Sequence, residues 1–135
     1  SHVTLARPEG VLIPDFLLTD VELQRAAVLE LKLPAPSLVR RQKNRDRFAT
    51  AVMEARAQLL RYRDWFRDAH NRRLLKRVVG MEIYEPTLIA VVGRSSEFRD
   101  GIDRQQLRAD VKDIEVVTYD DILTYAKRRR LIIEG

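Results

Sequence analysis

The first quarter of the chain carries the short-period apolar pattern of extended strands. Apolar residues dominate from Val11 to Leu18, and apolar and polar residues alternate in the second half of the segment Arg25 to Leu33. We predict about three strands between Val3 and Pro34. Gly10 and the Thr19-Asp20 pair are expected to form the turns between them.

A helical period follows a break in this pattern. Pro34 and Pro36 interrupt the extended segment, and Leu38 to Lys43 is expected to form a basic connector into a long helix. Asn44 or Asp46 is the candidate N-cap of that helix. Its apolar stripe recurs at alternating spacings of four and three and consists of Phe48, Val52, Ala55, Leu59, Tyr62 and Phe66.

The second half of the chain predicts alternating helices and strands. A short helix is expected over Arg72–Val79, ending at Gly80. The unbroken apolar run Thr87–Val92 predicts a central strand that is buried on both faces. The last expected elements are a helix over Asp103–Val111, a strand over Ile114–Tyr119 and a helix over Asp120–Arg130 capped by Asp120 or Asp121. The order βββαβαβα favours an α/β fold with a mixed central sheet flanked by helices.

Composition indicates one soluble domain. The 135 residues are 45% hydrophobic and 33% charged, which suits a single packed core. The absence of cysteine fits a reducing cytoplasm, and no apolar run approaches the roughly 20 residues that span a bilayer. Ser1-His2 looks like a cloning scar, so residues 3–135 are expected to be a single domain excised from a longer parent.

The charge balance favours an anionic partner. The net charge is +5 and the isoelectric point is about 9.9, and basic surfaces attract phosphate backbones. Candidate phosphate contacts are Arg40, Arg41, Lys43 and Arg94, although Arg94 fits a structural salt bridge equally well. The alternative for each basic cluster is a solvated helix face.

The most informative residues are Asp15, Glu30 and Lys32. Side chains two apart on a strand share a face, so Glu30 and Lys32 project together. The neighbours Leu29, Leu31 and Leu33 are expected to point the other way, into the core. If the strand that carries Asp15 pairs with this one, the two carboxylates converge on a cation.

This cluster predicts metal-assisted phosphodiester hydrolysis. Mg²⁺ or Mn²⁺ prefers oxygen ligands, and Asp15, Glu30 and the backbone carbonyl of Leu31 supply them. Lys32 is the candidate for holding or activating the attacking water and for offsetting charge in the transition state. The alternative is that Glu30 and Lys32 form an exposed cross-strand ion pair on a solvent-facing sheet.

The motifs together resemble the nuclease domain of the Shedu family. The resemblance rests on Pro14-Asp15-Phe16, on Glu30-Leu31-Lys32 with a proline close behind, and on the helical segment Ala55 to Tyr62. It continues in Val91-Val92-Gly93-Arg94 and in Thr118-Tyr119-Asp120, and it spans roughly Val11 to Leu123.

The resemblance implies a restriction-endonuclease-like PD-(D/E)xK core and a DNA endonuclease that serves bacterial defence against phages, usually as a homo-oligomer. It implies that Asp15 and Glu30 are metal ligands, that Lys32 is the catalytic lysine and that Gln58 completes the site. It also implies a regulatory N-terminal region in the parent protein. The alternative for Gln58 is an ordinary surface glutamine.

One feature departs from the superfamily pattern. Many members carry a further acidic residue on a helix before the first strand, and this chain begins too late to contain that helix; Glu9 and Glu22 are candidate substitutes. Two other functions stay open: a non-catalytic nucleic-acid-binding or oligomerisation domain with a vestigial site, and an RNA-directed enzyme of the same superfamily.

Several other residues are expected to have structural roles. His70 fits a surface position, and Trp65 and Phe66 continue the apolar stripe of the long helix. Tyr119 and Tyr125 are expected to pack around the last helix.

Overall fold

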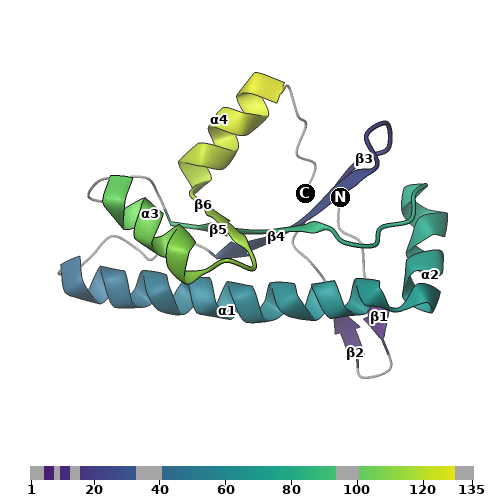
Figure 1. The fold of residues 1–135 in the computed structure, drawn as a ribbon, viewed down its shortest axis with the longest axis horizontal. Coiled ribbons are helices and arrows are strands. Elements are labelled where there is room, and N and C mark those ends of the chain that lie inside the picture. Colours follow the sequence, from purple (N-terminus) through teal and green to yellow (C-terminus); the bar gives the residue numbers. More distant parts are fainter. Residues whose placement is uncertain (1–4, 8–9, 13–15, 33–40, 94–100, 130–135) are drawn as a thin grey trace.

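A computed structural model describes residues 5–7, 10–12, 16–32, 41–93 and 101–129, with side chains described for residues 16–32, 50–93 and 105–124. It is an α/β structure in which a mixed sheet is flanked by helices, as the sequence predicted (Figure 1). The element order is ββββααβαβα. The prediction of about three strands before the long helix was therefore one strand short.

The central sheet has four strands in the order β3-β4-β5-β6. Strands β3 (Phe16–Asp20) and β4 (Arg25–Lys32) are antiparallel, while β4 runs parallel to β5 (Thr87–Val92) and β5 runs parallel to β6 (Glu115–Val117). The predicted bounds and the central place of β5 are confirmed. The additional strand arises because β1 (Leu5–Arg7) and β2 (Gly10–Leu12) form a separate antiparallel hairpin.

The turn between β3 and β4 lies later in the sequence than expected. Thr19 and Asp20 are the last residues of β3, and the turn follows them up to Gln24, whose φ is 52°. The Asp20 carboxylate accepts a hydrogen bond from the Leu23 amide at 3.1 Å. Asp20 thus shapes the turn through its side chain, since short polar side chains often bond the backbone nearby.

Two consecutive helices follow β4. Helix α1 (Arg41–Arg67) begins before both of its predicted caps, Asn44 and Asp46. Helix α2 (Ala69–Val79) begins earlier than predicted because the Asp68 carboxylate accepts a hydrogen bond from the Asn71 amide and caps it. It ends as predicted at Gly80, whose φ of 82° suits the left-handed cap.

The last two helices begin and end within two residues of their predicted bounds. Helix α3 (Gly101–Asp110) lies beside β6, and helix α4 (Tyr119–Arg129) follows β6 in the sequence. Thr118 caps α4: its hydroxyl accepts from the Asp121 amide, and the Asp121 carboxylate accepts from the Thr118 amide, both at 3.1 Å. This reciprocal capping box makes Thr118 the cap, which corrects the assignment of Asp120 or Asp121.

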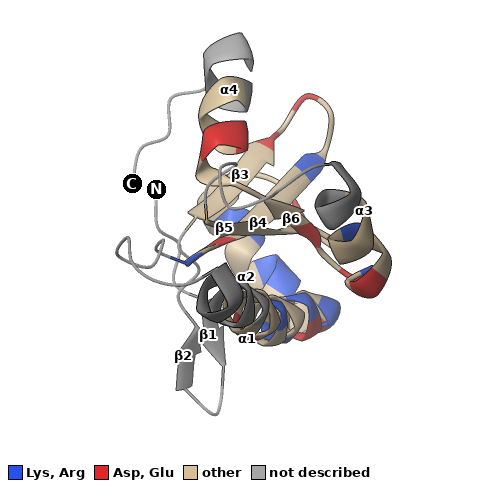
Figure 2. Cartoon of the chain, turned by 90° about the vertical axis from the view of Figure 1, so that its left-hand side faces the viewer, with Lys and Arg blue, Asp and Glu red and all other residues tan. Residues whose placement is uncertain are grey.

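Helices cover both faces of the sheet. Figure 2 looks along α1 and shows the sheet between α1 and α4. Helix α1 packs against β4 and β5, while α4 contacts β5. The Trp65 and Phe66 rings are buried, edge to face, with centroids 5.3 Å apart, so their predicted role in the core is confirmed.

The main core lies on the face of β4 that was expected to be polar. Val28 is fully buried in one cluster with α1 residues such as Leu59, and alternation along β4 gives Val28 the same face as Glu30 and Lys32. Leu29, which is 3% exposed, lies on the opposite face. Leu29 is thus buried on the face opposite Glu30 and Lys32, as predicted. The face that carries the two charged residues also carries buried Val28, because β4 is an interior strand covered by a helix.

Candidate active site

Glu30 and Lys32 lie on the last part of β4, next to the centre of the sheet. In the parallel ladder with β5, Glu30 is paired with Ala90 and Lys32 with Val92. Ala90 and Val92 are both buried in the main core. The two charged side chains therefore stand at the border of an apolar surface.

The carboxylate of Glu30 is partly withdrawn from water. The residue is half-buried, and its Oε2 atom is screened from solvent. A buried carboxylate is costly unless it is hydrogen-bonded, paired or bound to a cation. Such a position favours a carboxylate that is hydrogen-bonded, paired or bound to a cation.

Lys32 is paired with a carboxylate from helix α1. Its Nζ atom lies 3.6 Å from Oε2 of Glu54, with 31% of the lysine side chain and 62% of the glutamate side chain exposed. The alternative of an exposed cross-strand pair between Glu30 and Lys32 is therefore wrong. This end of the sheet is covered by α1, and the partner of Lys32 comes from that helix.

Gln58 lies on α1 one turn after Glu54. It is half-buried, and its Nε2 donates a hydrogen bond to the hydroxyl of Tyr62 at 3.1 Å. Glu54, Gln58 and Tyr62 are spaced by four, so they form one row along the helix. The first of the three contacts Lys32 and the last is fully buried, so the row runs from the polar end of the β4–α1 contact into its core.

The predicted acidic partner of Glu30 lies outside the described residues. Asp15 is joined directly to Phe16, which pairs with Leu29, the neighbour of Glu30. The antiparallel pairing of β3 with β4, on which the Asp15 prediction depended, is confirmed for residues 16–20. Within the described ranges no group of three or more His, Asp or Glu side chains is placed to bind a metal.

Of the two candidate substitutes for a further acidic residue, the structure describes Glu22, which does not join this cluster. Glu22 is exposed in the turn before β4, and the strand from Arg25 to Glu30 alone spans about 17 Å. Glu9 lies outside the described residues. Glu54 is the acidic residue that the structure brings to Lys32, and its spacing of four from Gln58 is the signal that could have indicated it.

The side chains of the four predicted phosphate contacts lie outside the described residues. Arg41 and Lys43 lie in the first turn of α1, but their side chains are outside the described residues, as are Arg40 and Arg94. Gly93, with a φ of 65°, accepts a hydrogen bond from the Tyr119 amide at 3.0 Å and so fixes the end of β5 to the start of α4.

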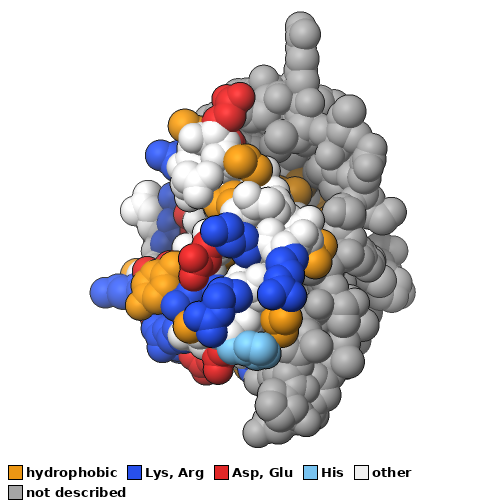
Figure 3. All heavy atoms as spheres, turned by 90° about the vertical axis from the view of Figure 1, so that its right-hand side faces the viewer, with side chains coloured by type: hydrophobic (Ala, Val, Ile, Leu, Met, Phe, Trp, Pro, Cys, Tyr) orange, Lys and Arg blue, Asp and Glu red, His pale blue; other side chains and the backbone are white. Residues whose placement is uncertain are grey.

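A second basic region covers α2. Figure 3 shows Lys and Arg side chains gathered at this end of the molecule. Exposed Arg73, Lys76 and Arg77 contribute to it, and His70 is exposed as predicted. Arg72 differs, because it donates to the carbonyls of Phe66 and Arg67, pairs with Glu82 at 3.0 Å and stacks on the Tyr84 ring. Arg72 therefore joins α2 to the end of α1 rather than serving a ligand.

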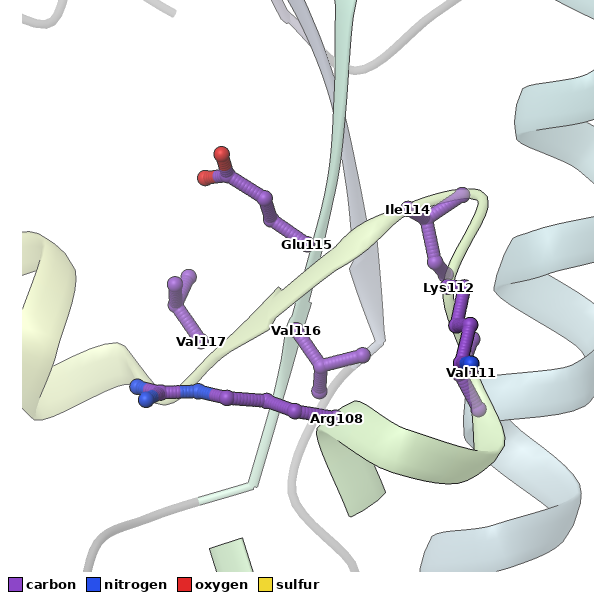
Figure 4. Close-up of a pocket in the computed structure, with 7 residues that line it drawn as sticks. All are labelled: Arg108, Val111, Lys112, Ile114, Glu115, Val116 and Val117. Carbon is purple, nitrogen blue, oxygen red and sulfur yellow. The ribbon is translucent and has the colours of Figure 1, made fainter. Parts of the chain in front are cut away.

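A groove of about 500 Å³ lies between α3 and β6. Figure 4 shows Arg108 extending along β6 towards Val117, with Glu115 on the other side of the strand from Val116. Glu115 is the one carboxylate among the residues that line the groove. The others are the cationic side chains of Arg108 and Lys112 and the apolar side chains of valine and isoleucine residues. Strand β5 separates this groove from the strand that carries Glu30 and Lys32.

The fold and the site define a class of domain. A mixed sheet with a glutamate and a lysine two apart on an interior strand, covered by a helix that adds a glutamate and a glutamine, is compatible with a PD-(D/E)xK core. The sequence model of the family described as Shedu protein SduA, C-terminal, matches residues 2–123, so the chain belongs to this family. Membership implies a place in anti-phage defence. No curated protein matches the chain.

The described helices do not have the character of membrane spans. Within the described ranges, none combines the length and the apolar composition needed to cross a bilayer.

Proposed function

We propose that this domain is a metal-dependent DNA endonuclease of the PD-(D/E)xK type. One observation carries the proposal: Glu30 and Lys32 lie on the same helix-covered face of an interior strand, where charged side chains are costly to bury unless they are paired or bind an ion. Phosphodiester hydrolysis is the chemistry that a carboxylate-bound divalent cation and an adjacent ammonium group serve together.

The donor set suits Mg²⁺ or Mn²⁺. Glu30 offers a carboxylate with one oxygen screened from water, and hard divalent cations bind proteins through one or two such carboxylates, carbonyls and waters. We assign Asp15, Glu30 and the carbonyl of Leu31 as the ligands. A cation held by these residues would supply polarisation of the phosphate and a lowered pKa of a coordinated water.

The side chains of the chain itself supply orientation and charge. Lys32, on the same face as Glu30, holds the attacking water and offsets the negative charge that develops on the phosphate oxygens. The hydrogen bond to Tyr62 fixes the side chain of Gln58. Gln58 completes the site from helix α1, opposite the residues of β4. The net charge of +5 favours association with a phosphate backbone.

The family membership supports the biological setting. The chain belongs to the Shedu family, and a nuclease in a defence protein is directed at invading DNA. We therefore propose DNA as the partner, an intracellular place of action and an assembly of several copies.

The test is cleavage of linear and circular DNA by the intact protein with Mg²⁺, with Mn²⁺ and with chelator. We expect cutting that needs the metal and that falls by at least about a hundredfold in Glu30→Gln, which keeps the size of the side chain and removes its charge. The matched control is Glu85→Gln, an exposed glutamate outside the site. DNA binding without any cutting contradicts the proposal and identifies a non-catalytic module, and cutting of RNA alone identifies an RNA-directed enzyme.

A further inference from the structure

Helix α1 brings to Lys32 a carboxylate that was not singled out from the sequence. Glu54 Oε2 lies 3.6 Å from Lys32 Nζ, and 22 positions of sequence separate the two residues. The contact exists because α1 returns across the face of β4 after the β4–α1 connection. It joins two elements, whereas the ion pairs of Asp64 with Arg63 and Arg67 stay within α1.

We propose that Glu54 is a positioning residue that holds the Lys32 ammonium group at the active site. The inference rests on the proposed nuclease function. Lys32 has a flexible four-carbon side chain. An ammonium group that samples many positions stabilises a transition state less than one held in place. A carboxylate anchored on a helix restricts the positions that this group samples.

The looseness of the contact suits this role. At 3.6 Å, with 31% and 62% of the two side chains exposed, the pair is too weak to contribute much to folding. Lys32 can therefore turn from Glu54 towards a phosphate when DNA is bound. A short, buried ion pair would instead oppose that movement.

The surroundings of Glu54 connect it to the rest of the site. It is followed after one turn by Gln58 and after two turns by Tyr62, and the Gln58–Tyr62 hydrogen bond fixes this row to the buried part of α1. A rigid helix thus presents Glu54 to β4, which is what accurate placement of a catalytic group requires.

The position of Glu54 predicts opposite effects on turnover and on substrate binding. Without its carboxylate, Lys32 is less restricted, so kcat should fall. A negative charge beside bound DNA also repels the backbone, so its removal should leave KM unchanged or lower it. A residue that merely stabilises the fold produces no such divergence once rates are corrected for the folded fraction.

The experiment measures kcat and KM for DNA cleavage by the intact protein carrying Glu54→Gln, Glu54→Asp or Asp64→Asn, each corrected for the folded fraction from its melting curve. Asp64 is the matched control, because it is an acidic residue of α1 with the same 62% exposure. We expect Glu54→Gln to lower kcat about threefold to tenfold without raising KM, as fits the partial restriction of an exposed ion pair. Glu54→Asp, whose carboxylate is one methylene further from Lys32, should lower kcat while leaving KM at the wild-type value.

A second readout does not depend on cleavage. The side-chain methylene resonances of Lys32, recorded by NMR without metal, should move in Glu54→Gln and stay in place in Asp64→Asn. If the wild-type protein cuts DNA but Glu54→Gln behaves as Asp64→Asn does in both measurements, the positioning role is wrong and the nuclease function stands. A wild-type protein that cuts no DNA with either metal overturns both.

Discussion

The contact between helix α1 and the central sheet has an apolar part and a polar part that differ in burial. In the apolar part, Leu59, Tyr62 and Phe66 are fully buried in the same cluster as Val28. In the polar part, Lys32 and Glu54 keep 31% and 62% of their side chains exposed. The difference indicates that the apolar part holds helix α1 on the sheet. The position of the helix then sets where Glu54 lies relative to Lys32.

This division separates the effects of substitutions. Burial of large apolar side chains contributes several kcal/mol each, while an exposed ion pair contributes about 0 to 1 kcal/mol. Changes in the apolar part should therefore act on stability first, and changes in the polar part should act on activity with the fold intact.

Phe66→Ala should have the largest effect on stability. The side chain is fully buried against Trp65, so its truncation leaves a cavity and should lower the free energy of unfolding by about 3 to 5 kcal/mol. Urea denaturation followed by circular dichroism measures the change. Met53→Ala, at a 52% exposed position of the same helix, should lower the free energy of unfolding far less. Equal losses of stability in the two variants would contradict the distinction between the buried and the exposed side of α1.

Ala55→Leu tests how closely the helix must approach the sheet. Ala55 is fully buried in the main core, so a larger side chain should push α1 away and cost about 1 to 3 kcal/mol. The same displacement should impair DNA cleavage, because Glu54 and Gln58 move with the helix. Ala57→Leu places the same change at an exposed position, and a stability loss there as large as at Ala55 would contradict the packing described.

Tyr62→Phe tests the connection between the two parts. The substitution keeps the buried ring and removes the hydroxyl that accepts the Gln58 hydrogen bond, so we expect a loss of about 0.5 to 1.5 kcal/mol and slower cleavage. Thermal melting and a cleavage assay on the same samples measure the two effects. Tyr84→Phe, at a 62% exposed ring, is the control, and unchanged cleavage in Tyr62→Phe would separate Gln58 from the site.

The sequence predicted the architecture because strong apolar patterns dominate it. The run Thr87–Val92 defined β5 to the residue, and the stripe through Leu59, Tyr62 and Phe66 identified the buried side of α1. The hairpin of β1 and β2 was missed as a separate unit, since strands of three residues carry too little alternation to be counted. The cap of α4 was predicted at Asp120 or Asp121 because the segment Thr118-Tyr119-Asp120-Asp121 holds three good cap residues. Only the hydrogen bonds distinguish Thr118.

The candidate site was predictable only in part, for a geometric reason. Alternation along β4 showed that Glu30 and Lys32 share a face, but alternation cannot say which face a distant helix will cover. The partner of Lys32 was missed because Glu54 is an exposed glutamate on a charged helix, and its contact with Lys32 depends on where α1 crosses β4.

The measurement that tests the central claim most directly is made on Lys32→Ala, by following Mg²⁺-dependent DNA cleavage and urea unfolding of the same preparation, with Lys76→Ala, an exposed lysine of α2, as control. The account predicts a free energy of unfolding within about 1 kcal/mol of the wild-type value and cleavage reduced by about a hundredfold or more. Cleavage at the wild-type rate, or a loss of stability as large as that of Phe66→Ala, would contradict it.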